Sequence, residues 1–173
     1  MIIREATAAD ATNIARVHVD AWRATYAGIV PADFLAQLSY ESRERMWTRI
    51  LSQGDTFTFV AEAAPGTVVG FANGGPERSG DPVYRGELYA IYLLPAHQGQ
   101  GVGRALARTV AARLADNGFQ SMLVWVLAAN PARHFYAALG GRPVREQETE
   151  VGGARLSEVA YGWTDLEPLL RPA

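Results

Sequence analysis

The chain has 173 residues, 49% of them hydrophobic and 20% charged, so we expect a single domain over residues 1–173 with one continuous core. Its net charge of −2 argues against a surface that holds nucleic acid or an anionic membrane by charge, and neither is expected as a partner. The absence of cysteine excludes disulfides, thiolate metal sites and a cysteine nucleophile, and no metal is expected.

The N-terminal part of the sequence predicts one strand followed by three helices. Thr7 with Asp10 three residues later resembles a capping box, and apolar side chains then recur at helical spacing. Pro31 is suited to open a second helix, and Ser39 can cap a third. We expect a strand over residues 2–5, a first helix that ends near residue 28, and helices over 31–38 and about 41–51.

The middle of the chain predicts a hairpin and then a strand–helix–strand unit. Two segments rich in β-branched and aromatic residues flank a Pro-Gly turn, and a stretch of glycines, prolines and charges follows as a loop that we expect to be mobile. A right-handed crossover would make the last two strands parallel neighbours or near neighbours. The expected ranges are a hairpin over 56–62 and 68–73, a loop over 74–82, strands over 87–94 and 121–127, and a helix that ends at 117–118.

The C-terminal part predicts a short helix and a closing hairpin. The helix is expected over 131–139, where two glycines stop it, and the hairpin over 144–150 and 155–163, where Gly152 and Gly153 provide the turn. Seven strands and five helices therefore follow in the order βααα-ββ-βαβ-αββ.

The most informative segment is Gln98-Gly99-Gln100-Gly101-Val102-Gly103, between an apolar strand and an amphipathic helix. Its glycines let the main chain turn tightly, so that several N–H groups converge where the helix adds its positive dipole end. This arrangement is typical of a diphosphate site. The glycine spacing does not fit a dinucleotide fold, and a P-loop is excluded because the chain contains no lysine.

Two motifs carry a family resemblance. Gln98, Gly101 and Gly103 fill the pattern Q/R-x-x-G-x-G/A, and Asn130 to Tyr136 resembles N-x-x-A-x-x-F-Y with the small residue displaced by one. With the element order, these motifs make the sequence similar to the GCN5-related N-acetyltransferase (GNAT) superfamily over essentially its whole length. The resemblance implies an α/β (α+β) fold with a mixed central sheet of about seven strands flanked by helices.

The resemblance also implies acetyl-CoA as the acyl donor and assigns residues to it. The turn would hold the pyrophosphate, and the Leu93 amide would polarise the thioester carbonyl, since Pro95 has no N–H. Asn130 would contact the pantetheine arm, with Tyr136 near the sulfur. The implied donor-binding residues are Leu93, Gln98, Gly99, Gly101, Val102, Gly103, Arg104, Asn130 and Tyr136.

Each candidate catalytic residue also has an interpretation in which its role is only structural. Tyr136 is expected to be the general acid that protonates the departing thiolate, the alternative being that Phe135 and Tyr136 only pack. Glu87 is a candidate general base and acceptor contact, with a solvated strand-end carboxylate equally compatible. Exposed or loop positions are expected for His134 and His97, and His18 is a weaker candidate for the acceptor pocket.

The resemblance implies that the first helices and the closing hairpin recognise the acceptor. Trp22 and Tyr26 lie one helical turn apart and, with Trp47, could form an aromatic wall, although packing in the helix core explains them equally well. The segment around Trp22 resembles a subgroup of bacterial family members. Glu146, Glu148 and Glu150 share one strand face, which could attract a cation but is more typical of a solvated edge.

The leading hypothesis is an N-acetyltransferase that transfers the acetyl group to a primary amine of a small molecule by direct attack in a ternary complex. Acetylation of a protein N-terminus, of another macromolecular amine such as one bound to tRNA, or a non-catalytic acyl-CoA sensor are the alternatives. We expect a cytoplasmic protein, because the sequence shows neither a signal peptide nor an apolar run of about 20 residues. A homodimer is compatible with the resemblance.

Overall fold

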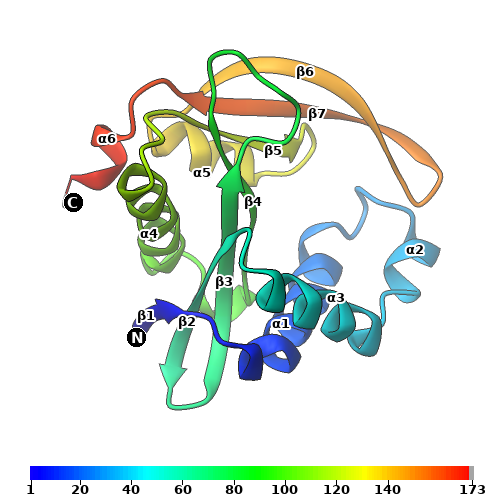
Figure 1. Ribbon diagram of the computed structural model, residues 1–173. Helices are drawn as coiled ribbons and strands as arrows, with labels where there is room; N and C mark the ends of the chain where they lie inside the picture. Colours follow the sequence, from blue (N-terminus) through cyan, green and yellow to red (C-terminus); the bar gives the residue numbers. More distant parts are fainter. Residues whose placement is uncertain (172–173) are drawn as a thin grey trace.

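The computed structural model describes residues 1–171, which form one seven-stranded mixed sheet in the order β1-β2-β3-β4-β5-β7-β6 with helices on both faces (Figure 1). None of the helices in this part of the chain combines the length and apolarity that a membrane span requires. The strands are β1 (Ile2–Glu5), β2 (Phe57–Ala64), β3 (Thr67–Pro76), β4 (Gly86–Leu93), β5 (Met122–Leu127), β6 (Arg142–Val151) and β7 (Ala154–Trp163). The helices are α1 (Ala11–Thr25), α2 (Ala32–Ala36), α3 (Tyr40–Gln53), α4 (Val102–Asp116), α5 (Ala132–Ala138) and α6 (Glu167–Leu170).

The predicted elements and the fold class are confirmed, with small shifts at their ends. Ser39 accepts the Ser42 N–H at 3.2 Å and so caps α3 as expected. The predicted loop over 74–82 is the main difference, because β3 continues to Pro76. The rest of this loop is anchored by Asp81. Its buried carboxylate accepts hydrogen bonds from the main-chain N–H groups of Val83 and Tyr84 and forms an ion pair with Arg145 of β6.

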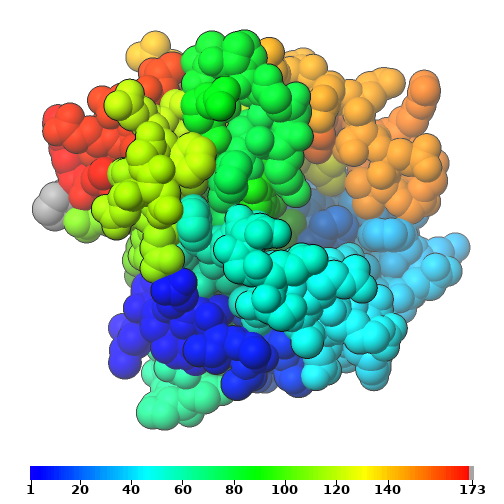
Figure 2. All heavy atoms as spheres, viewed as in Figure 1, coloured from blue at the N-terminus to red at the C-terminus, as the bar shows by residue number. Residues whose placement is uncertain are grey.

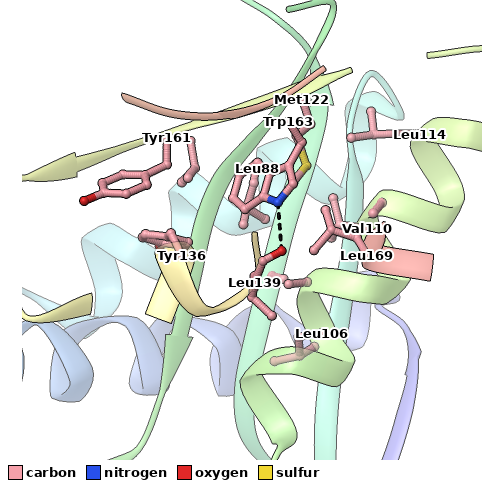
Figure 3. Packing of buried hydrophobic residues seen from close by; sticks show 14 of the residues in the cluster. Leu88, Leu106, Val110, Leu114, Met122, Tyr136, Leu139, Tyr161, Trp163 and Leu169 are labelled. Atoms are coloured by element: carbon pink, nitrogen blue, oxygen red, sulfur yellow. Dashed lines mark hydrogen bonds between the residues drawn. The ribbon is translucent and has the colours of Figure 1, made fainter. Parts of the chain in front are cut away.

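The two faces of the sheet carry separate cores. Helices α4, α5 and α6 pack on one face, where Trp163 of β7 donates its indole N–H to the Leu139 carbonyl at 3.0 Å (Figure 3). Helices α1 and α3 pack on the other face, around Trp47 and Phe71, whose rings meet edge to face at 4.9 Å between centroids. The sheet is therefore buried on both sides, which explains why β5 is almost continuously apolar.

A β-bulge in β4 changes the face to which its side chains point. Asn73 of β3 pairs with Ala90 and Gly74 pairs with Leu88, so Tyr89 is an extra residue on β4. Leu88 before the bulge packs with α4, whereas Ala90 after it belongs to the α1 side, although strict alternation would put both on one face. Gly74 opposite the bulge has no room for a side chain, since a Cβ there would lie 2.6 Å from Val110 Cγ1 of α4.

Strands β4 and β5 separate soon after they meet. Their parallel pairing consists of Gly86 with Met122 and Glu87 with Leu123, and beyond these pairs the two strands diverge (Figure 1). The later part of β4 therefore pairs only with β3. Because Leu94 N–H bonds to the Val69 carbonyl of β3, alternation directs the Leu93 N–H to the opposite side, toward the gap.

Candidate active site

A cavity of about 740 Å³ occupies the gap between β4 and β5. Its walls come from the end of α1, the bulged half of β4, the glycine turn, β5 and the start of α5. Because Leu93 belongs to the α4 side of the sheet and Tyr92 to the α1 side, the cavity reaches both faces. It is lined by Ala24, Thr25, Tyr26, Tyr89, Ala90, Ile91, Tyr92, Leu93, Pro95, Gln98, Gly99, Gly101, Gly103, Arg104, Val124, Trp125, Val126, Asn130, Pro131, Ala132, Phe135 and Tyr136.

The glycine turn forms the α4 end of this cavity. Gly99 and Gly101 have φ angles of +71° and +81°, which side-chain-bearing residues rarely adopt. Gly101 is the N-cap of α4, and the first intrahelical bond is Ala105 N–H to its carbonyl at 3.0 Å. The N–H groups of Val102, Gly103 and Arg104 therefore lie at the positive end of a 15-residue helix without an intrahelical acceptor.

The side chains around the turn leave room for a ligand and tie the turn to β4. A Cβ on Gly103 would lie 3.3 Å from both Leu93 Cδ1 and Phe135 Cζ, so even a small side chain would crowd the cavity wall. Gln98 donates its amide N–H to the Leu93 carbonyl at 3.2 Å. Arg104 is exposed at the rim, whereas the Val102 side chain is buried in the core and only its main chain can serve the site. This geometry fits a diphosphate.

Asn130 and Tyr136 occupy the wall formed by α5. Asn130 is 4% exposed, and its Oδ1 accepts the Ala132 N–H at 2.9 Å, which fixes the start of the helix. Tyr136 is 6% exposed and packs against Phe135 and Tyr161, and burial raises its pKa well above the usual value. Its hydroxyl has no hydrogen-bond partner among residues 1–171, and the residue lines the cavity, so the hydroxyl keeps its proton and can donate it to a ligand there.

The α1 end of the cavity is aromatic. The hydroxyl groups of Tyr26 and Tyr92 are 3.1 Å apart, and Asn130 Nδ2 donates to the Tyr26 oxygen at 3.4 Å. Trp22 packs against Tyr26 with ring centroids 4.4 Å apart but stands behind the lining. Trp47 is 2% exposed and belongs to the core, so of the predicted wall of Trp22, Tyr26 and Trp47 only Tyr26 lines the cavity, beside Tyr92.

Glu87 lies on β4 before the bulge and is 3% exposed. Its carboxylate is held by Arg78, which donates from its side chain to both oxygens and from its main chain to Oε2. Glu87 does not line the cavity, and the described lining contains no carboxylate or imidazole at all. A base in direct contact with a ligand is therefore not evident in this part of the chain.

The remaining titratable candidates lie elsewhere. His18 is 8% exposed and packs on the α1 side of the sheet, where its Nδ1 accepts the Trp47 indole N–H at 3.1 Å. Burial, followed by the charge of Arg43, lowers the pKa of His18 to about 3, so its imidazole is neutral at pH 7. His134 is exposed, as the sequence predicts, and so are Glu146, Glu148 and Glu150 on β6.

Sequence reasoning missed Tyr89, Tyr92, Trp125 and Phe135 as cavity residues. The signal that could have found Tyr92 is its place next to Leu93 at the end of the strand before the turn. The bulge at Tyr89 prevented this prediction, because simple alternation does not give the side of the sheet that residues after a bulge face.

Comparison with known proteins agrees with this geometry. A family model described as "Acetyltransferase (GNAT) family" matches residues 17–140. An uncharacterized N-acetyltransferase, YuaI of Bacillus subtilis (strain 168), is 47% identical over 167 residues, which cover 96% of this chain and 95% of that protein.

Solved structures share the fold at lower identity. YncA, a putative acetyltransferase from Salmonella typhimurium with its cofactor acetyl-CoA, superposes with a TM-score of 0.70 at 23% identity, covering 96% of this chain and 94% of the other. The PaiA N-acetyltransferase from Thermoplasma acidophilum in complex with coenzyme A gives 0.66 at 20% identity, covering 91% and 96%. With a family match over most of the chain and a full-length relative, this protein belongs to the GNAT family of N-acetyltransferases.

Proposed function

We propose that the protein transfers an acetyl group from acetyl-CoA to a primary amine of a small molecule, by direct attack of the amine while both substrates are bound. The observation that carries this proposal is the cavity between β4 and β5, which joins the glycine turn on the α4 side to Tyr26 and Tyr92 on the α1 side. A donor held at the turn and an acceptor entering from the α1 side would meet where the strands diverge. A cytoplasmic location is part of the same proposal.

The donor side is supported by the main chain. The N–H groups of Val102, Gly103 and Arg104 have no intrahelical acceptor and would bind the diphosphate, and Asn130, which lines the cavity, would contact the pantetheine arm. The structures named above with acetyl-CoA or coenzyme A bound support the same donor for this chain. Acetyl-CoA supplies a thioester, whose carbonyl carbon the amine attacks.

Three groups of the chain are proposed to act on the reacting atoms. The Leu93 N–H points into the gap and would stabilise negative charge on the thioester oxygen. Tyr136 would donate its hydroxyl proton to the departing sulfur. Glu87 remains the proposed base, and because it does not line the cavity it would take the amine proton through water.

A small acceptor is favoured by the contact between the β6–β7 hairpin and α2 beside the α1 end. The turn of the β6–β7 hairpin rests on α2, where a Cβ on Gly152 would lie 2.6 Å from Phe34 Cβ, and Figure 2 shows the two segments side by side. The cavity volume is also in the range of small-molecule sites. An open groove would instead suit a protein N-terminus or another macromolecular amine.

Two experiments test the proposal. Titration calorimetry with acetyl-CoA should show one binding event. The absence of binding at millimolar acetyl-CoA would contradict the proposed function. Thiol release across a panel of small amines, with the acetylated product identified by mass, should then find an acceptor. Binding without release from any small amine or N-terminal peptide would favour an acyl-CoA sensor.

A further inference from the structure

The α1 end of the cavity contains more hydrogen-bond donors than acceptors. Asn130 is fixed in orientation because its Oδ1 accepts the Ala132 N–H at 2.9 Å, so its Nδ2 faces Tyr26 as a donor. The Tyr26 oxygen therefore receives a hydrogen from Asn130. Apart from this bond and the bond that joins Tyr26 to Tyr92, neither tyrosine hydroxyl has a partner of normal hydrogen-bond geometry within residues 1–171.

Counting hydrogens on the two tyrosines leaves one of them free. Two phenol groups carry two hydroxyl hydrogens, and their mutual bond at 3.1 Å uses one, whichever oxygen donates. The second hydrogen has no side-chain acceptor in the described chain. Both side chains line the cavity, and Tyr26 is only 6% exposed, so this hydrogen is available to a ligand oxygen inside the cavity.

Trp22 adds a second donor at the same place. Its indole nitrogen is buried and has no hydrogen-bond partner among residues 1–171. Burial raises the pKa of Tyr92, and the Trp22 N–H opposes that rise by acting on the Tyr92 hydroxyl as a hydrogen-bond donor outside the normal geometry. Buried donors without acceptors are costly, and they are a reason to look for a ligand that supplies one.

The charge around this end also favours an electron-rich ligand group. Arg43 of α3 is partly buried, and its charge contributes to the lowered pKa of His18, whose ring stacks on Tyr92 with centroids 5.3 Å apart. Arg43 donates to Met46 Sδ at 3.5 Å and has no carboxylate partner within residues 1–171. Arg43 therefore places a positive charge near Tyr92, and no ion pair within residues 1–171 offsets it.

These donors lie toward the α1 side of the cavity. Tyr26 and Tyr92 lie on the α1 side of the sheet, whereas the glycine turn and Leu93 lie with α4. Building on the function proposed above, we propose that Tyr26 and Tyr92 bind a carboxylate or carbonyl oxygen carried by the acceptor. The acceptor class is then an amino acid or amino-acid amide, and a plain alkylamine lacks the group that this site recognises.

Matched acceptors test this proposal directly. Leucine, leucinamide and 3-methylbutylamine share an amine and a side chain. Leucine adds a carboxylate, leucinamide adds an amide carbonyl, and 3-methylbutylamine has neither. Phenylalanine, its amide and phenethylamine repeat the comparison with an aromatic side chain. At saturating acetyl-CoA, kcat/KM from thiol release should be at least about 10-fold higher for an oxygen-bearing member than for the plain amine. A higher kcat/KM for the acid than for the amide would show that the acceptor oxygen bound by the tyrosines belongs to a carboxylate. The preference for its negative charge would then be assigned to Arg43.

The variants follow from the hydrogen count. Tyr92→Phe alone still leaves the Tyr26 hydroxyl hydrogen free, so it should retain part of the preference, and Tyr26→Phe likewise. The double variant removes both hydroxyls and should bring the acid, amide and plain amine within about 3-fold of one another. Its dissociation constant for acetyl-CoA should stay unchanged, while the KM for leucine or leucinamide rises. Tyr84→Phe, the same change at a buried tyrosine outside the cavity, should keep the full preference.

The outcomes separate this inference from the function on which it rests. Equal kcat/KM for all members of both sets in the unaltered protein would overturn the inference and leave the N-acetyltransferase proposal intact. A double variant that loses all acceptors equally, or that loses acetyl-CoA binding, would also overturn it, since the hydroxyls would then serve the fold or the donor. No thiol release with any amine would instead overturn the proposed function.

Discussion

The side chain of Arg78 covers the buried carboxylate of Glu87. Arg78 Nε and its main-chain N–H each donate to Oε2 at 3.2 Å, and the guanidinium carbon lies 4.0 Å from the centre of the Tyr89 ring, which lines the cavity. The hydrogen bond to Glu87 raises the pKa of Arg78, so this guanidinium stays charged. The proposed base is thus paired with a cation that stacks on an aromatic ring of the cavity wall.

The Glu87→Gln variant is expected to lower kcat about 100-fold at neutral pH, because an amide cannot accept the amine proton. The loss should shrink as the pH approaches the pKa of the acceptor amine, since more of the amine then arrives without its proton. Initial rates between pH 6.5 and 10 test this. An equal loss at every pH, together with a lower melting temperature, would assign Glu87 to holding Arg78 and the loop in place.

The Tyr136→Phe variant is expected to reduce kcat by about 10- to 100-fold while the dissociation constant for acetyl-CoA stays within about 2-fold. The change removes only the hydroxyl, and that hydroxyl has no partner within residues 1–171, so packing around Phe135 is preserved. Tyr161→Phe is the matched control, because it changes the neighbouring ring outside the cavity. Unchanged turnover in Tyr136→Phe would contradict a general-acid role for Tyr136 and would mean that water protonates the thiolate.

Substitution of Gly103 should separate donor binding from folding. The Cβ of Gly103→Ala would lie 3.3 Å from Leu93 Cδ1 and Phe135 Cζ, so a modest loss of acetyl-CoA affinity, about 3- to 10-fold, is expected from the small displacement this requires. Gly103→Leu should abolish binding in calorimetry, because its side chain would occupy the cavity. Circular dichroism should show intact secondary structure for both, and tight binding by the leucine variant would place the donor elsewhere.

His18 should make the fold sensitive to acid. Its pKa is lowered to about 3, mainly by burial, whereas the imidazole of the unfolded chain takes up a proton near pH 6.5. Below that pH the unfolded state binds more protons than the folded state, so stability falls as the pH drops toward 3, by at most about 1.4 kcal/mol per pH unit. Between pH 7 and 5 the loss attributable to His18 is about 2 kcal/mol.

Urea unfolding of the protein and of His18→Gln at pH 7 and pH 5 checks this expectation. Glutamine does not titrate and keeps an acceptor for the Trp47 indole N–H, so the variant should show a smaller difference between the two pH values. The same pH dependence in both proteins would mean that His18 is protonated in the folded state near its ordinary pKa.

The sequence predicted the elements well because local signals agreed with the tertiary fold. Ser39 caps α3 as expected, and the glycines of the turn adopt the positive φ angles that their spacing suggests. The turn lies within a strand–helix–strand unit, and Asn130 and Tyr136 follow its second strand directly, so their meeting in the cavity could be anticipated.

The acceptor side could not be predicted in the same way. Tyr26 and Tyr92 are separated by 66 positions, and their contact depends on the bulge at Tyr89 and on the divergence of β4 from β5. Neither feature has a clear local signature. Likewise, the loop expected to be mobile is held by Asp81 and Arg145, a pair formed between distant parts of the chain.

The extra residue in β4 has a consequence for how this family member can change over time. Residues after Tyr89 face opposite sides from those that uninterrupted alternation would assign, and two separate cores depend on that assignment. A substitution in β4 changes one side chain and leaves the facing of the others unaltered. Loss or gain of a single codon there would turn Tyr92 and Leu93 to the wrong sides together, so length in this strand is under tighter constraint than composition.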